Sequence, residues 1–508
     1  MEIPICSNMP PTSENIQNVA IIGAGLSGIV SAAHLLRGGL DVTVFERGDK
    51  GGPWDAESDP EATSRIFAPP GPVYTNMKGR GNEVVMRTTL RDWPEGIKAP
   101  IDHRDVVAYL RDIADTYQIH DRIHFRTRVD SITRQSRGWN VQTSSLLPAD
   151  TGHAPKRGAW NFDAVVVAAG RYGVPRVPDV PGLARWKARF PSRIMHTKQY
   201  RTPEPYRGKT VLVIGAHISA LDITNEMVGG GAAKVYQSAR PTEVDFRGLV
   251  SSTGEGTTTV VKVAMVEEFA TWATDDGLDA TEAADTTLDD DAPIPARVTL
   301  QDGRILDNIH HILFATGYLA SFPFLGPVLE QPFTKPQDAD ETVILTADAK
   351  TVHNLHEDIF YIPDPSLAFI GVTQYASTFS LYDIQAKVLA AVWAGRARSP
   401  SPEAMREAQR RRKRQVELLP GASLNGIYLL DDFVIRRLLD WVNGADSTKN
   451  GDAVLGPDAK WWAAFRAESE HARPVLGRLQ DNYLRTYGTS WEELQFQVLY
   501  RGSTTRRN

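Results

Sequence analysis

The chain has 508 residues, of which 42% are hydrophobic, and it carries a formal net charge of −6 with a pI near 6.1. This length supports roughly two to four domains, and the mild negative charge gives no general attraction to nucleic acid or to an anionic membrane surface. The single cysteine, Cys6, allows neither a disulfide framework nor a cysteine-ligated metal site. We therefore expect no metal, no nucleic-acid partner and a reducing compartment.

The first 16 residues are polar and proline-rich, and we expect a flexible leader there. Acid and proline stand where a signal peptide would carry positive charge and an apolar stretch. The chain also lacks a run of about 18 apolar residues, which a membrane-spanning helix would need. The sequence therefore predicts a cytoplasmic protein that does not enter a membrane.

A dinucleotide-binding fingerprint opens the folded part of the chain. A short apolar strand over residues 18–22 runs into Gly23-Ala24-Gly25-Leu26-Ser27-Gly28, and a helix is predicted from there to about residue 37. A second strand over residues 41–45 ends at Glu46. This order of elements is typical of a βαβ unit that binds a dinucleotide: a strand, a glycine-rich turn, a helix, and a second strand that ends in an acidic residue.

Each residue type in this fingerprint has a physical role. Gly23 permits the tight turn, Gly25 lets the backbone approach a pyrophosphate, and Gly28 lets the helix pack on the strand. The helix N-terminus, at Leu26 and Ser27, stabilises the phosphate charge. Glu46 can accept hydrogen bonds from ribose hydroxyls and would repel a 2′-phosphate, so this site is predicted to hold FAD or NAD.

The following residues favour FAD. The sequence continues Arg47-Gly48-Asp49-Lys50-Gly51-Gly52-Pro53-Trp54. Paired glycines let the backbone pass close to a flat ring, and Trp54 can flank that ring. We therefore predict that Arg47, Gly52, Pro53 and Trp54 belong to the FAD site, although a tryptophan alone is more often a core residue.

A second opening of the same kind follows later in the chain. The strand over residues 210–214 runs into Gly215-Ala216-His217-Ile218-Ser219-Ala220, with His217 in place of the middle glycine. We assign Gly215, His217, Ser219 and Ala220 to a second nucleotide site. Its second strand, residues 234–238, ends at Ser238 without an acid, and Arg240 follows. A hydroxyl and an arginine suit the 2′-phosphate of NADPH, although Arg240 could also be a plain surface residue.

Two further segments set the domain boundaries. Prolines between residues 174 and 182 cannot continue a helix or strand, and residues 311–318 repeat the pattern of an apolar strand followed by glycine. We predict an α/β fold with two Rossmann-like domains and a mainly helical C-terminal extension. The predicted bounds are a leader over 1–16, an FAD-binding domain over 17–172 and 312–399, an NADPH-binding domain over 173–311, and the extension over 400–508.

Two charged runs have a simpler interpretation. The acidic residues between 275 and 291 are predicted to form a solvated loop, with a metal site as the less favoured alternative. The basic run over residues 410–414 lies in a predicted helix and indicates a solvated helix face rather than a nuclear-localisation or RNA-binding patch.

With these motifs in place, the chain resembles the flavin-containing monooxygenase family of class B flavoprotein monooxygenases. The motif of that family, Phe-x-Gly-x-x-x-His-x-x-x-Tyr/Phe, is matched by Phe190, His196 and Tyr200, with Ser192 where the family has glycine. The resemblance covers about residues 17–395. Related Baeyer–Villiger enzymes carry tryptophan at the position of Tyr200, so oxidation at nitrogen or sulfur is favoured.

The resemblance also implies roles for single residues. Gln374 would lie near the flavin, Val129 would offer its backbone to the adenine, and Thr316 belongs to a matching Ala-Thr-Gly-Tyr motif. His196 would be a structural link between domains rather than a catalytic base.

The resemblance also indicates candidates for the catalytic residue. Many relatives place an asparagine beside the flavin C4a, and counting from Tyr74 puts Arg80 on that position. A shift of the loop would bring Asn76 or Asn82 there instead. Arg80 and Asn76 are therefore the catalytic candidates.

The family implies a reaction in which NADPH reduces FAD, O₂ forms a C4a-hydroperoxyflavin, and a small organic substrate takes one oxygen atom, here in specialised metabolism. A Baeyer–Villiger monooxygenase acting on a ketone and a flavin-bound module that does not oxygenate remain alternatives. A disulfide reductase would need a redox cysteine pair, which Cys6 alone cannot form. The expected partners are a small molecule and O₂, and a homodimer is left open.

Overall fold

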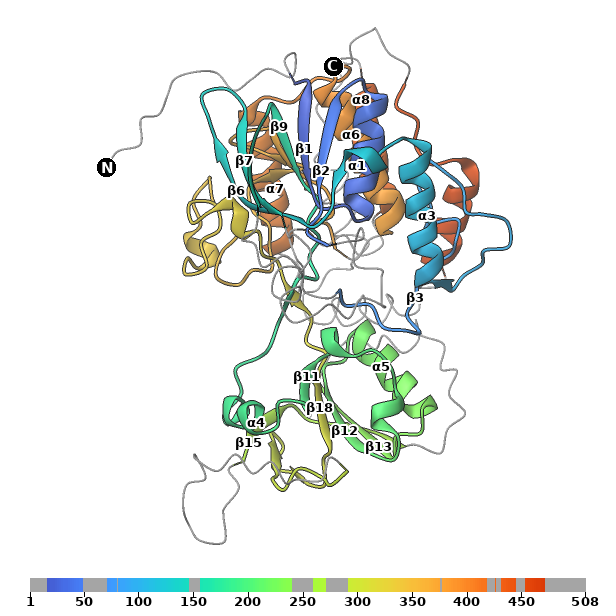
Figure 1. Ribbon diagram of the computed structural model, residues 1–508, viewed down its shortest axis with the longest axis vertical. Helices are drawn as coiled ribbons and strands as arrows, with labels where there is room; N and C mark the ends of the chain where they lie inside the picture. The colour runs from blue at the N-terminus through green and yellow to red at the C-terminus, as the bar shows by residue number, and fades with distance from the viewer. Residues whose placement is uncertain are drawn as a thin grey trace, which may run out of the picture. The chain divides into compact units, whose positions relative to one another are not determined.

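A computed structural model defines the chain over residues 16–48, 71–79, 81–145, 156–239, 259–270, 291–374, 377–417, 425, 431–444 and 453–470. The chain divides into two compact units, Met1–Val174 with Leu319–Ser469 and Pro175–Tyr318 with Glu470–Asn508. Each unit contains a sheet with parallel strands and at least one helix that follows a strand (Figure 1). The predicted α/β class with two Rossmann-like units is confirmed.

The first unit is built on a seven-stranded sheet in the order β20-β21-β22-β9-β1-β2-β5. Its central strand β1 (Asn18–Ile22) pairs in parallel with β2 (Asp41–Phe45) and with β9 (Ala164–Val167). These strands are almost continuously apolar because both faces of a parallel sheet are covered. The outer strands are β5 (Ile123–His124), β20 (Leu355–His356), β21 (Phe360–Tyr361) and β22 (Leu367–Phe369).

Helices cover one face of this sheet, and a smaller antiparallel sheet covers the other (Figure 1). Successive residues of β1 point to opposite faces, so Ile21 packs under the helices while Ile22 packs against the small sheet. The helices are α1 (Leu26–Arg37), α3 (His103–Thr116), α6 (Thr378–Trp393) and α8 (Asp431–Asn443). The small sheet consists of β6 (Thr127–Arg134), β7 (Trp139–Ser145) and β8 (Lys156–Phe162).

The second unit contains a five-stranded parallel sheet in the order β11-β18-β12-β13-β14. The helix α5 (Ile218–Gly229) connects β12 to β13, as the crossover of a parallel pair requires. The strands are β11 (Ile194–His196), β12 (Thr210–Ile214), β13 (Lys234–Ser238), β14 (Thr259–Val263) and β18 (His311–Phe314). A three-stranded antiparallel sheet adds β15 (Val266–Phe269), β16 (Val298–Leu300) and β17 (Ile305–Leu306), and α4 is Leu183–Arg189.

Short elements complete the described chain. The remaining strands are β3 (Lys78–Gly79), β4 (Ile101–Asp102), β10 (Val174–Pro175) and β19 (Tyr318–Leu319). The 3-10 helices are η2 (His120–Arg122), η4 (Thr197–Gln199), η5 (Glu204–Tyr206), η7 (Pro323–Leu325) and η8 (Pro336–Asp338).

The described part of the C-terminal region is largely helical and belongs to the first unit up to Ser469. It contains α7 (Pro402–Glu417), α8 and a helical stretch over residues 459–470. The predicted leader, except residue 16, and nearly all of the acidic loop lie outside the described residues. Within the described part, none of the helices is long and apolar enough to cross a membrane.

Candidate functional site

The turn between β1 and α1 has the shape that a bound pyrophosphate needs. Gly23 has φ +107°, and a Cβ there would lie 2.6 Å from the carbonyl oxygen of Ala168. A Cβ on Gly28 would lie 1.9 Å from the carbonyl oxygen of Gly23. Only glycine fits at these two positions, so the backbone forms a cradle that side chains would fill.

The N-terminus of α1 is open to an anion. Gly25 is the N-cap residue, and Leu26 and the buried Ser27 form the start of the first turn. Within the described residues, no side chain caps this end and the first turn carries no acid. The backbone N–H groups and the helix dipole therefore favour phosphate here, and the predicted residues Gly23 to Gly28 fit the group.

Glu46 lies beside this turn and organises it. One carboxylate oxygen accepts a hydrogen bond from the backbone N–H of Ala24 at 2.9 Å, and the other accepts from the N–H of Gly48 at 2.8 Å. A carboxylate has about four acceptor positions, so both oxygens keep room for ribose hydroxyls. Arg47 is exposed next to it. The predicted residues Gly52, Pro53 and Trp54 lie outside the described part of the chain.

Val129 lies on β6 with its side chain buried. The pairing of β6 with β7 shifts register between Val129 and Ser131, which is a β-bulge. A bulge interrupts the regular ladder of hydrogen bonds at this point of the strand.

Gln374 is held by groups that sequence reasoning missed. Its backbone N–H donates to the carbonyl oxygen of Asn425 at 2.7 Å. When the side-chain amide of Gln374 is oriented with its oxygen towards Arg171, this oxygen accepts hydrogen bonds from the guanidinium group. The Nη1 atom of Arg171 lies 2.9 Å from it. Arg171 also donates to the carbonyl oxygens of Val372 and Lys350, both at 2.5 Å.

The catalytic candidates lie on the segment after Tyr74, which is buried. Asn76 is exposed in a turn closed by the N–H of Met77 bonding to the carbonyl of Tyr74 at 3.0 Å. Asn82 uses its side-chain oxygen to accept from the N–H of Val84 at 2.8 Å. Arg80 lies outside the described residues.

The second glycine turn repeats the geometry of the first. Gly215 has φ +135°, and a Cβ there would lie 2.3 Å from the carbonyl oxygen of Ala315. His217 is the N-cap residue of α5, and within the described residues no side chain caps that helix and no acid stands in its first turn. Ser219 is exposed and Ala220 is fully buried, so alanine replaces the last glycine where the helix packs.

Two other predicted residues of the second unit make internal hydrogen bonds. Ser238 is buried at the end of β13, and its hydroxyl donates to the carbonyl oxygen of Ala264 at 2.8 Å. The hydroxyl of Thr316 donates to the carbonyl oxygen of Arg176. Arg240 lies outside the described residues.

His196 is held as a neutral ring within the second unit. Its Nε2 lies 3.0 Å from the carbonyl oxygen of Gly317, and its Nδ1 lies 3.1 Å from the backbone N–H of Lys198. A carbonyl can only accept and an amide can only donate, so Nε2 carries the hydrogen. Burial lowers the pKa of His196 to about 4. The ring thus joins β11 to the segment that follows β18.

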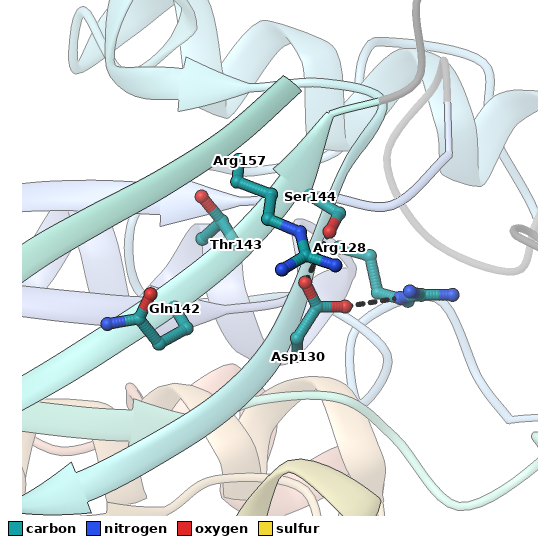
Figure 2. Close-up of a pocket in the computed structure, with 6 residues that line it drawn as sticks. All are labelled: Arg128, Asp130, Gln142, Thr143, Ser144 and Arg157. Carbon is teal, nitrogen blue, oxygen red and sulfur yellow. Dashed lines mark hydrogen bonds and ion pairs between the residues drawn. The ribbon is translucent and has the colours of Figure 1, made fainter. Parts of the chain in front are cut away.

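A pocket of about 450 Å³ lies on the small sheet of the first unit (Figure 2). Arg128 and Asp130 pair at 2.7 Å within it, and Ser144 also bonds to Asp130. Arg128 and Asp130 therefore neutralise each other, while Arg157 leaves the pocket with one positive charge. None of the six lining residues is a predicted site residue. They are Arg128, Asp130, Gln142, Thr143, Ser144 and Arg157.

The basic run on α7 differs from its prediction at one residue. Arg410 and Arg414 pair with Glu407 on the exposed side of the helix, as a solvated face would. Arg412 instead turns inward and pairs with the buried carboxylate of Asp358 at 2.9 Å. The prediction of a solvated face is therefore wrong for Arg412, since a buried acid draws this residue towards the core.

Comparison with known proteins defines the family. The sequence matches the family described as flavin-binding monooxygenase-like over residues 16–261 and 295–429, and the chain belongs to this family. It is an oxygenase enzyme and a flavoprotein.

Two curated relatives and one solved structure illustrate the similarity. The chain is 33% identical to flavin-containing monooxygenase ustF2 of Aspergillus flavus, with 91% of this chain and 98% of that protein covered. It is 27% identical to flavin-containing monooxygenase iboF of Amanita muscaria, with 86% and 90% covered. Its fold is similar to that of S-allyl-L-cysteine S-oxygenase from Allium sativum, with a TM-score of 0.65, 23% identity, and 95% and 97% covered.

Proposed function

We propose that this flavoprotein transfers one atom of O₂ to a nucleophilic nitrogen or sulfur of a small organic molecule in specialised metabolism. The observation that carries the proposal is the pair of glycine cradles, each at the N-terminus of a helix without a side-chain cap among the described residues. Such a pair suits one dinucleotide in each unit. The likeness to an S-oxygenase supports the substrate class, and the fungal relatives support monooxygenase activity.

The first unit would hold FAD. Gly25 would let the backbone contact the pyrophosphate, because Gly23 permits the tight turn and Gly28 the close packing of the helix. Glu46 would bind the ribose. Val129 would offer its backbone to the adenine. When bound, the flavin supplies the chemistry with O₂, while the protein binds the reactants, orients them and excludes water.

The second unit would hold NADPH. The backbone from Gly215 to Ala220 would contact the pyrophosphate, with His217 at the N-cap of α5. The hydroxyl hydrogen of Ser238 is already used by Ala264, so we assign recognition of the 2′-phosphate to Arg240. His196 needs no role as a base, because both ring nitrogens are bonded within the fold.

Arg240→Ala tests the NADPH assignment. Loss of a charged contact to the 2′-phosphate should weaken NADPH binding roughly ten- to a hundredfold, while NADH binding barely changes. Binding of both nucleotides is measured by titration of the purified protein. An equal loss for both would show that Arg240 supports the fold instead.

Product analysis tests the substrate class. The purified enzyme is supplied with NADPH, O₂ and an amine, a thioether or a ketone, and NADPH consumption is followed together with the mass of the product. We expect a gain of one oxygen atom with the amine or thioether. Conversion of the ketone to an ester with neither of the others oxidised would instead establish a Baeyer–Villiger monooxygenase.

A further inference from the structure

Asn425 is a buried residue of the C-terminal region whose side chain bonds to two other segments. Its Oδ1 accepts from the backbone N–H of Val352 at 2.8 Å. Its Nδ2 donates to the carbonyl oxygen of Val352 at 3.3 Å and to Oδ1 of Asp358 at 2.9 Å. The residue is 0% exposed, so these bonds replace water completely. An amide is suited to this position because it donates and accepts at once.

The backbone of Asn425 extends the network to Gln374. Its carbonyl oxygen accepts from the N–H of Gln374 at 2.7 Å, while Arg171 contacts the side chain of Gln374. Gln374 is therefore fixed through its main chain by Asn425 and through its side chain by Arg171. Only the first contact comes from the C-terminal region.

Asp358 joins this network to a positive charge. Its second oxygen accepts from Arg412 on α7 at 2.9 Å and lies 3.4 Å from the hydroxyl of Thr373. Asp358 is buried and has φ +57°, a left-handed conformation that is uncommon for a residue other than glycine. The carboxylate is thus placed by its backbone and balanced by Arg412. Asn425 then connects it to Gln374.

We propose that Asn425 is a positioning residue that holds Gln374 in place for the flavin by joining it to the pair of Asp358 and Arg412. The proposal rests on the proposed function and on the family resemblance, which implies that Gln374 lies near the flavin. It gives the C-terminal region a part in the oxygenation site, although none of its groups needs to touch the flavin.

The decisive variant is Asn425→Asp, in which the side chain keeps its size. A carboxylate replaces the amide whose Nδ2 donates to Asp358, so two carboxylates face each other. Two carboxylates about 3 Å apart repel each other and cannot both ionise freely. We expect the variant to retain FAD, to change the visible spectrum of the bound flavin, and to lose roughly tenfold in kcat for NADPH oxidation. The KM for NADPH should stay within about twofold, because the second nucleotide site is untouched.

The effect should also depend on pH. As the pH falls, the introduced carboxyl and Asp358 share a proton, and a donor is restored between the two positions. The kcat of Asn425→Asp relative to wild type should therefore rise towards lower pH. A general loss of packing would not produce this pH profile.

Two further proteins make the test specific. Asn161→Asp is the matched control, because Asn161 is exposed on β8 and its side-chain oxygen only accepts from Asn140 at 3.1 Å. It should match wild type at every pH. The double variant Asn425→Asp/Asp358→Asn restores one amide and one carboxylate, and it should recover part of the lost kcat.

The outcomes separate this proposal from the proposed function. If Asn425→Asp has the flavin spectrum and kcat of the wild type, the positioning role of Asn425 is overturned and the proposed function stands. If the wild-type protein binds no flavin, the proposed function is overturned as well. If Asn425→Asp does not fold, Asn425→Ser keeps the backbone contact and removes the contacts of the amide. It should show the same change of flavin spectrum, and an unchanged spectrum would overturn the proposal.

Discussion

The carboxylate of Glu46 accepts a hydrogen bond from the backbone N–H of Ala24 at 2.9 Å, which joins the residue after β2 to the glycine turn after β1. Its other oxygen accepts from the backbone N–H of Gly48 at 2.8 Å, so one side chain holds the backbone of the glycine turn and of the segment after β2. Glu46 therefore shapes the site in addition to the ribose contact that its position indicates.

Glu46→Gln should weaken FAD binding. The glutamine oxygen can still accept a hydrogen bond from one of the two backbone N–H groups. Its NH₂ group then faces the other N–H, so that hydrogen bond is lost and two donors face each other. A loss of about 1–2 kcal/mol, or roughly five- to thirtyfold in affinity, is expected. Titration of the apoprotein with FAD measures it. Glu267→Gln, an exposed change on β15, is the control, and equal affinities for the two variants would contradict the role of Glu46.

Gly28→Ala should abolish FAD binding at the first unit. The added Cβ would lie 1.9 Å from the carbonyl oxygen of Gly23, so the turn or the helix must move. The control is Gly229→Ala in α5, where a Cβ meets no atom within 4 Å among the described residues. We expect colourless protein from Gly28→Ala and normal flavin content from Gly229→Ala. Full flavin content in folded Gly28→Ala would place the FAD elsewhere.

The sequence predicted the elements around the glycine turns well. The predicted strands over residues 18–22, 41–45, 210–214 and 234–238 are β1, β2, β12 and β13 with the same bounds. Each is a short apolar run next to glycine or polar residues, so local pattern alone defines its ends.

Contacts between distant segments could not be predicted in this way. Asn425 forms a hydrogen bond with Asp358, which lies 67 positions earlier in the sequence. Arg412 belongs to a basic run whose pattern predicts a solvated helix face, and only the fold shows that it pairs with Asp358. A single polar residue carries no periodic signal, and only the fold shows which one becomes buried. The same holds for His34 and Asp383, which are 349 positions apart.

The buried pair of His34 on α1 and Asp383 on α6 should make stability depend on pH. Nε2 of His34 lies 2.6 Å from Oδ1 of Asp383, whose other oxygen accepts from the N–H and hydroxyl of Thr89 at 2.8 and 2.6 Å. Burial lowers the pKa of His34 below its usual 6.5, although Asp383 opposes this. Burial raises the pKa of Asp383, but His34, the charge of Lys387 and the hydrogen bond from Thr89 together outweigh burial. The pKa of Asp383 is therefore lowered overall.

The lowered pKa values of His34 and Asp383 both make the folded protein less stable as the pH falls. A histidine with a lowered pKa takes up its proton more readily in the unfolded chain, so stability falls as the pH drops below about 6.5. The lowered pKa of Asp383 adds a further loss as the pH falls below its usual 3.8. Urea unfolding between pH 7 and pH 5 should show the first loss, and His34→Asn should reduce it, because other buried histidines such as His196 still contribute. An unchanged slope in His34→Asn, or an equal effect from His120→Asn on the surface, would contradict the assignment.

Arg80 lies between Gly79 and Gly81 in the sequence. Both glycines pack closely against the side chain of Met86. A Cβ on Gly79 would lie 2.6 Å from Cε of Met86, and a Cβ on Gly81 would lie 2.8 Å from its Cγ. The N–H of the next residue, Asn82, bonds to Glu468 of the C-terminal helical stretch. The backbone on both sides of Arg80 is therefore held closely.

We predict that Arg80→Ala leaves NADPH-driven flavin reduction nearly intact but uncouples it from oxygenation. A guanidinium at the flavin edge would stabilise negative charge that develops on oxygen, and its loss should raise the share of NADPH that ends as hydrogen peroxide roughly two- to tenfold. Peroxide release per NADPH consumed is the measurement, with Arg157→Ala on the exposed surface of β8 as the control. Unchanged coupling would remove Arg80 from the site. Asn76 would then be the next candidate, because the side-chain oxygen of Asn82 is already bonded to Val84.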